Sequence, residues 1–294
     1  MPVNGIYKRV AKPNSIELPD CEPILILYED RSVIAVDKPR GWMLLPVSWQ
    51  NTGRNLQAAI NSSITARDFW ARSRGVKFLR YVHRLDADTS GVLLFVKSPG
   101  AVETYSDLFE SRKMEKMYLA VVDGKPRETE WTCQLKLLPD PRRVGRMKVD
   151  SRDGKEAETH FRVLQKHDHL TLVEAKPVTG RTHQIRVHLA EVGLPIVGDE
   201  LYGREDCKIN LDSSSRRKEA HFKIGNRPAK REEIGNKMEP RHLGCDETLK
   251  EPPMNLGLRA VRLAYNDPFT KKRVEIRAPV ETFCREFGFD ISKL

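Results

Sequence analysis

The chain has 294 residues, and its 51 Lys and Arg exceed its 41 Asp and Glu to give a formal net charge of +10. It contains no run of 18 apolar residues and no apolar segment near its amino terminus, so neither a membrane span nor secretion is indicated. We therefore expect a soluble, intracellular and cytoplasmic protein, whose basic charge suits a polyanionic partner such as a nucleic acid.

The five cysteines are widely scattered and form no CxxC pair, which favours reduced thiols over a disulfide framework. Zinc binding is a minor alternative, because one segment contains two cysteines and two histidines at irregular spacing: Cys207, His221, His242 and Cys245. We expect no metal.

The order of predicted elements favours a mixed α/β (α+β) domain built around a largely antiparallel sheet with flanking helices. Residues 1–20 resemble a tail, and residues 24–41 contain two β-rich runs around a turn, which predicts a hairpin. Further strands are expected at 91–96, 118–122, 132–138, 158–164, 170–175, 260–265 and 273–276. Helices are expected at 56–62, 100–111, 182–192 and 280–287.

Residues 204–253 interrupt this pattern. Only eight of these 50 residues are Leu, Ile, Val, Phe or Met, whereas 22 are charged. Such a segment cannot bury enough apolar surface to fold by itself. We interpret it as a flexible insertion in a single domain formed by residues 21–203 and 254–294.

The sequence HRLDADTSG, residues 83–91, precedes the apolar run VLLFV, which predicts a strand buried on both faces. Asp86 is thereby placed at the edge of the core, where an ionised carboxylate needs a cation or hydrogen-bond donors. His83 and Arg84 are close in sequence, but neighbours in an extended segment alternate faces. On these residues alone, an aspartate that caps a turn is the simpler interpretation.

The sequence VTGRTHQIRVHLAEVGLP, residues 178–195, predicts a helix capped by Thr182 and ended by Gly193 and Pro195. Its start is crowded with side-chain donors, which suit a phosphate or a carboxylate. A solvated helix end with incidental charges is the alternative. The donors are Arg181, Thr182, His183, Gln184 and, one turn further, Arg186.

The third stretch, EKMYLAVVDG, residues 115–124, has an aromatic residue at the edge of an apolar strand. Tyr118 could fill the core, or it could stack on a base and exchange a proton at the wall of a pocket.

Together these stretches resemble the RluA family of RNA pseudouridine synthases, whose motifs HRLDxxTSG, KxYLAVVxG and GRTHQIRVHL occur here in the same order. The resemblance covers residues 24–203 and, more weakly, 256–280. It implies the pseudouridine synthase fold, with Asp86 as the catalytic carboxylate, Arg181 as its partner and Tyr118 beside the target base. It also implies RNA-binding roles for His83, Arg84, Thr182, His183, Gln184 and Arg186.

The implied reaction converts uridine in ribosomal or transfer RNA to pseudouridine. It breaks the N1–C1′ bond, joins C5 to C1′ and releases the C5 proton, with no net oxidation and hence no cofactor; the chain has no P-loop or dinucleotide fingerprint. Asp86 would attack the sugar or abstract a sugar proton, and the sequence leaves both routes open. We expect a monomer that extrudes the uridine from RNA. An inactive RNA-binding or RNA-chaperone protein of the same fold is the alternative.

Overall fold

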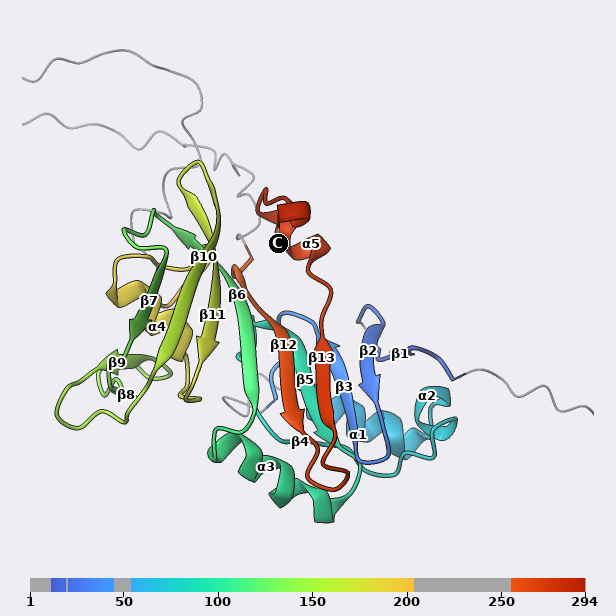
Figure 1. Ribbon diagram of the computed structural model, residues 1–294. Coiled ribbons are helices and arrows are strands. Elements are labelled where there is room, and N and C mark those ends of the chain that lie inside the picture. The colour runs from blue at the N-terminus through green and yellow to red at the C-terminus, as the bar shows by residue number, and fades with distance from the viewer. Residues whose placement is uncertain (1–11, 20, 45–53, 204–254, 294) are drawn as a thin grey trace, which may run out of the picture. The chain divides into compact units, whose positions relative to one another are not determined.

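The computed structural model describes residues 12–19, 21–44, 54–203 and 255–293 (Figure 1). The first elements in chain order are β1 (Ser15–Ile16), β2 (Ile24–Glu29), β3 (Val33–Lys38), α1 (Leu56–Ala66), α2 (Phe69–Arg72), β4 (Arg80–Tyr81), β5 (Ser90–Val96) and α3 (Val102–Glu110). They are followed by β6 (Glu115–Asp123), β7 (Glu130–Cys133), β8 (Leu137–Pro139), β9 (Met147–Val149), β10 (Thr159–His167), β11 (Leu170–Pro177), α4 (Gln184–Glu191), β12 (Leu258–Asn266), β13 (Arg273–Arg277) and α5 (Glu281–Glu286).

Within the described residues, eleven strands form one sheet with the order β1-β2-β3-β5-β12-β6-β11-β10-β7, and β13 and β4 pair with β12 and β5. The strand pairings of this part of the chain are antiparallel except that of β5 with β12. The expected α+β class with a largely antiparallel sheet is confirmed. β12 returns from the far end of the chain and separates β5 from β6 (Figure 1).

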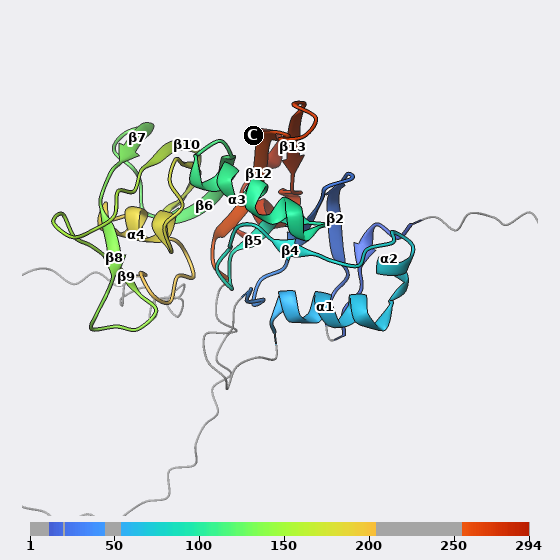
Figure 2. The same cartoon turned by 90° about the horizontal axis from the view of Figure 1, so that it is seen from below.

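Strand β5 is buried along its whole length, as its apolar sequence predicts. Leu93 and Phe95 pack in one core with Leu56 and Ile60 of α1. The alternate residues, Val92, Leu94 and Val96, pack in a second core with Tyr105 of α3. Figure 2 shows α1 and α3 on opposite sides of this strand. The segment that precedes β5 is therefore anchored from both faces of the sheet.

Most expected elements are present, with shifted ends. The strand expected at 132–138 is two strands, because β7 joins β10 whereas β8 pairs with β9 in a separate two-stranded sheet. The short elements β1, α2, β4 and β9 carry too few residues for a periodic pattern.

The structure describes only part of the predicted tail and none of the predicted insertion, so both remain predictions. The four candidate zinc ligands also lie outside the described residues. In the part of the chain that is described, no helix is both long and apolar enough to cross a membrane.

The start of β5 lies unusually close to β12. Gly91 has φ +111°, and a Cβ atom added there would lie 2.0 Å from the carbonyl oxygen of Ala260. Only glycine combines this backbone conformation with such a close approach. Arg259, the neighbour of Ala260, is buried and donates to the Ser90 hydroxyl and the Asp37 carboxylate, at 3.0 and 2.7 Å.

Lys38 at the end of β3 holds the loop between Asp86 and β5. Its side chain is fully buried, and Nζ donates to the carbonyl oxygens of Pro39 at 3.0 Å, Ala87 at 2.7 Å and Thr89 at 3.0 Å. Burial lowers the pKa of Lys38 to about 7, although the charges of nearby aspartates act in the opposite direction. The conformation of this loop therefore depends on a side chain almost 50 residues earlier.

We expect Gly91→Ala to lower the free energy of unfolding by about 3 kcal/mol or more, since it adds a steric clash to an unfavourable φ. Two matched variants separate these causes. Gly75→Ala has a positive φ in open space, and Gly100→Ala has open space without a positive φ. Urea denaturation should rank Gly91→Ala well below both controls, and equal stabilities would contradict the close approach of β5 and β12.

We expect Lys38→Met to lower stability at pH 7 by about 1–3 kcal/mol, because three backbone carbonyls lose their donor. An unfolded lysine keeps its proton up to about pH 10.4, whereas folded Lys38 releases its proton near pH 7. The unfolded chain thus binds more protons above pH 7, so the stability that Lys38 contributes rises with pH.

The difference in unfolding free energy between wild type and Lys38→Met should accordingly widen from pH 7 to pH 9. The exposed Lys77 provides the matched control, because Lys77→Met makes the same change of side chain without removing a buried one. A constant difference for Lys38→Met would contradict the lowered pKa.

Candidate functional site

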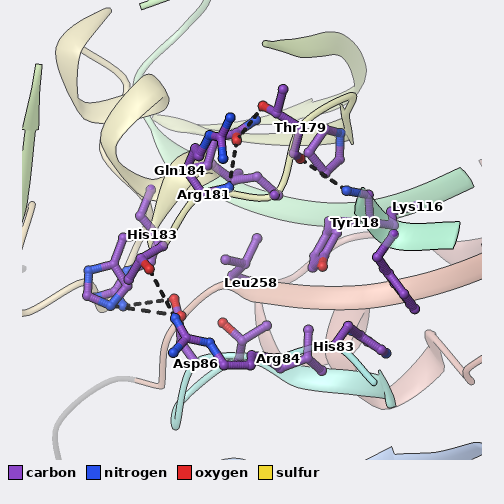
Figure 3. Close-up of a pocket in the computed structure, with 18 of the residues that line it drawn as sticks. His83, Arg84, Asp86, Lys116, Tyr118, Thr179, Arg181, His183, Gln184 and Leu258 are labelled. Atoms are coloured by element: carbon purple, nitrogen blue, oxygen red, sulfur yellow. Dashed lines mark hydrogen bonds and ion pairs between the residues drawn. The ribbon is translucent and has the colours of Figure 1, made fainter. Parts of the chain in front are cut away.

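A cleft of about 380 Å³ lies beside the centre of the sheet and includes Asp86 among its lining residues. Its walls come from the loop before β5, from β6, from the segment before α4 and the first turn of that helix, and from Leu258 at the start of β12. Figure 3 shows Arg84 and Asp86 on one side and Arg181 and Gln184 on the other, with Tyr118 and Leu258 between them. The volume is in the range of sites for small ligands.

Arg186 is the cation that holds Asp86. Its Nη1 donates to Asp86 Oδ2 at 3.2 Å, while Nε and Nη2 form a two-pronged contact with Asp199 at 2.8 Å each. The Asp199 side chain is fully buried and that of Arg186 is 6% exposed, whereas the Asp86 side chain is 26% exposed toward the cleft. One buried guanidinium therefore joins a fully buried carboxylate to one that is exposed in the cleft.

The surroundings of Arg186 fix its charge and orientation. Burial opposes the charged form, but the hydrogen bonds and negative charges of Asp199 and Asp86 raise the pKa of Arg186 above its ordinary value. Asp199 Oδ1 also accepts from the backbone N–H groups of Leu201 and Tyr202, at 2.9 and 3.0 Å. The planar guanidinium gives Asp199 a two-pronged contact and still has an N–H for Asp86, a fixed fork geometry that an ammonium group lacks.

The expectation that Arg181 pairs with Asp86 is wrong. Arg181 Nε instead donates to the carbonyl oxygen of Glu156 at 2.9 Å. Among the described residues, the basic side chains within 4.0 Å of the Asp86 carboxylate are those of Arg186 and His183. The physical reason is that α4 begins only at Gln184, so Arg181 lies in the loop before the helix while Arg186 lies in its first turn. Arg181 still lines the cleft.

Thr182 does not cap the helix as predicted. The residue at the start of α4 is His183, in the left-handed conformation with φ 54° and no capping side-chain bond. The Thr182 hydroxyl accepts a hydrogen bond from Arg84 Nη2 at 3.0 Å. Arg84 thus links the Asp86 loop to the segment before α4, and its own side chain is exposed at the rim of the cleft.

Gln184 is buried, and its amide is fully engaged within the protein. Its oxygen accepts from the Thr179 hydroxyl and the Arg181 N–H, and its nitrogen donates to the Glu158 carbonyl and the Thr159 hydroxyl. This arrangement ties the helix to β10 and argues against the expected direct contact of Gln184 with RNA.

Tyr118 lies on β6 between Ala175 of β11 and Ala260 of β12. Burial, with a smaller effect of the negative charge of Asp86, raises the pKa of Tyr118, so the phenol keeps its proton. Within the described ranges its hydroxyl has no hydrogen-bond partner, and the ring lines the cleft beside Leu258 (Figure 3). This surface can take the face of a base and offer one hydroxyl.

His83 points its Nε2 toward β5, where it accepts from the Leu94 N–H at 3.0 Å, and its ring stacks on Phe109 with centroids 4.5 Å apart. Burial lowers the pKa of His83 to about 3, so the ring is neutral. His83 lines the cleft, but its hydrogen bond and its ring contact are both made within the protein. Direct RNA binding by His83 stays a prediction.

Three residues of the site were missed by the sequence reasoning. Asp199 and Tyr202 belong to the GDELYG segment, where the acid could have indicated a second partner for an arginine. Lys116 lies two residues before Tyr118 and donates to the Thr179 carbonyl at 3.0 Å. Burial, and the neighbouring charge of Arg112, lower the pKa of Lys116 to about 8.

The arrangement combines an accessible carboxylate, a buried arginine that orients it and an aromatic wall. It can act on an electrophilic carbon or a weakly acidic proton of a ligand that enters the cleft. Within the residues whose structure is described, no cluster of three or more His, Cys, Asp or Glu could hold a metal ion.

A sequence model of the family described as RNA pseudouridylate synthase matches residues 32–191. The relatives include "Uncharacterized RNA pseudouridine synthase YlyB" of Bacillus subtilis (strain 168), which is 35% identical over 69% of this chain and 65% of its own. "Ribosomal large subunit pseudouridine synthase C" of Yersinia pestis is 38% identical over 67% of this chain and 57% of its own. The chain therefore spans less than two thirds of the length of these relatives.

Two solved human structures share the fold. "RNA Pseudouridylate Synthase Domain Containing 4" has a TM-score of 0.62 and 20% identity, over 90% of this chain and 94% of that chain. "RNA Pseudouridylate Synthase Domain Containing 1" has a TM-score of 0.59 and 23% identity, over 87% and 83%. The matched family model covers more than half of the sequence, and we conclude that this chain belongs to the family of RNA pseudouridylate synthases, as its resemblance to the RluA family predicted.

Proposed function

We propose that this protein isomerises a specific uridine in RNA to pseudouridine, with Asp86 as the catalytic carboxylate. The observation that supports this most directly is the ion pair of Asp86 with the buried Arg186 in a cleft of nucleotide size. Arg186 orients the Asp86 carboxylate, whose oxygens can attack C1′ or abstract a sugar proton. Family membership supports the same reaction.

In this reaction the N1–C1′ bond breaks, the base turns within the site, and a C5–C1′ bond forms. N1 ends with a proton and C5 loses one, so no electrons are gained or lost overall. Tyr118 lies where it can stack on the detached base and keep it in the cleft while it turns. Asp86 can serve by either route, since its Oδ1 has no hydrogen bond within the described structure.

We propose large-subunit ribosomal RNA as the substrate, because relatives carry the name "Ribosomal large subunit pseudouridine synthase C". The rim of the cleft presents the guanidinium groups of Arg84, Arg112 and Arg181, which suit the phosphates on either side of a flipped nucleotide. The cost of extrusion, a few kcal/mol, would be offset by stacking and by these phosphate contacts.

We expect wild-type protein to release tritium from large-subunit ribosomal RNA transcribed with [5-³H]uridine. Asp86→Asn keeps the shape of the side chain but removes its charge, so release should fall at least about a thousandfold. Asp88→Asn is the matched control, since it neutralises an exposed acid two residues away and should retain activity.

Equal release by wild type and Asp86→Asn would contradict the role of Asp86. The alternative is an RNA-binding protein without turnover. It would be favoured if the wild-type protein binds ribosomal RNA but releases no tritium, either from that RNA or from total unmodified RNA.

Arginine variants test the corrected pairing. Arg186→Lys keeps a positive charge but cannot span Asp86 and Asp199, so kcat should fall roughly a hundredfold through misplacement of Asp86. Arg181→Lys should leave kcat nearly unchanged and mainly raise KM, because Arg181 lies at the rim without contact to Asp86. Thermal melts should be recorded for both variants, and the reverse pattern in folded proteins would restore Arg181 as the partner.

A further inference from the structure

A chain of hydrogen bonds reaches the site from the β8–β9 hairpin. The backbone N–H of Met147 on β9 donates to the Tyr202 hydroxyl oxygen at 2.8 Å. The same hydroxyl lies 2.9 Å from Nδ1 of His183. Because the oxygen already accepts from Met147, its own proton is available for His183, and Nδ1 is then the acceptor.

This assignment fixes the tautomer of His183. Burial lowers the pKa of His183, although Asp86 opposes this effect, so the ring is neutral at pH 7 and carries one proton. With Nδ1 accepting from Tyr202, that proton is on Nε2. Nε2 faces Asp86 Oδ1 at 3.8 Å, on the opposite carboxylate oxygen from the one that Arg186 holds.

The position of the two rings is fixed independently of these hydrogen bonds. The rings of His183 and Tyr202 meet edge to face with centroids 5.6 Å apart. The guanidinium groups of Arg146 and Arg186 lie 5.0 and 5.3 Å from the centre of the Tyr202 ring. The left-handed backbone of His183 is unfavourable for a residue with a Cβ, and such conformations persist where the surroundings impose them.

We propose that His183 and Tyr202 are positioning residues for the isomerisation, in which the Tyr202 hydroxyl keeps His183 in the Nε2–H form so that a donor faces Asp86 Oδ1. This inference rests on the proposed function of Asp86. Arg186 fixes Oδ2, and the His183 N–H limits rotation of the carboxylate about its Cβ–Cγ bond by favouring one orientation of Oδ1.

The opposite tautomer would have the reverse effect. It would turn the Nε2 lone pair toward a carboxylate oxygen, and the two would repel each other. Asp86 would then move away from the orientation set by Arg186. At 3.8 Å the N–H does not yet form a hydrogen bond with Oδ1, so this oxygen stays available to the substrate.

The primary test is Tyr202→Phe, which removes the hydroxyl and keeps the ring for both arginines. We expect ¹⁵N NMR of histidine-labelled protein to show a loss of the pure Nε2–H signature of His183, assigned by comparison with a His183 variant. With the [5-³H]uridine transcript, kcat should fall roughly tenfold with little change in KM.

Tyr105→Phe is the matched control. Tyr105 of α3 is also a buried tyrosine, and its hydroxyl donates a hydrogen bond to Asp267. Its replacement should lower thermal stability but leave both the tautomer of His183 and kcat unchanged. A purely structural role of Tyr202 would make the two variants behave alike, which would overturn the proposal.

Variants of His183 test the donor itself. Asn tolerates the left-handed conformation better than most residues but its amide does not reach the position of Nε2, whereas Gln places an N–H there. We expect kcat to fall in the order wild type, His183→Gln, His183→Asn. Adding Tyr202→Phe to His183→Asn should cause no further loss, because Tyr202 acts through His183.

Wild-type kcat in His183→Asn, or an unchanged tautomer in Tyr202→Phe, would overturn the inference. The NMR signature requires no turnover. A pure Nε2–H form in a wild-type protein that releases no tritium would therefore refute the proposed function while leaving the Tyr202–His183 hydrogen bond intact.

Discussion

The site depends on a single buried guanidinium shared by two carboxylates. Asp199 takes two of the N–H groups of Arg186 and is itself completely enclosed, so the arginine cannot turn without leaving a buried charge unpaired. Arg186 then donates to Asp86 through Nη1, whose direction is fixed by the contact with Asp199. Asp86 is thus oriented by a guanidinium that a completely buried carboxylate holds in place.

The two halves of this contact come from distant parts of the chain, and the sheet brings them together. Asp86 precedes β5 and Arg186 follows β11, with β12 and β6 between these strands. The cleft opens where those four strands lie side by side, which is why Tyr118 of β6 and Leu258 of β12 line it. Lys38 and Gly91 then fix the loop that carries Asp86 relative to the sheet.

The sequence was sufficient for the fold class, the long strands and the three motifs, because these depend on local periodicity and on specific residue patterns. The sequence did not identify which cation contacts Asp86. Five donors occur within six residues, and choosing among them requires knowing that His183 is left-handed, that α4 starts after it, and that Asp199 returns beside the helix. The roles of Gln184 and Lys38 were equally hidden, since both bind backbone or side-chain groups far away in sequence. Short elements such as β4 and α2 gave no pattern at all.

Because β5 is buried on both faces, its pairing with β3 also determines where Asp86 lies. Successive residues of the strand belong to different cores, so a slip of one residue in its pairing with β3 would exchange the two sets of side chains and disrupt both cores at once. The same slip would displace Asp86 by about 3.3 Å along the strand direction. A chain with a shifted β5–β3 pairing is therefore too unstable to remain folded. All folded chains share one pairing of these strands, and Asp86 has the same position in each of them.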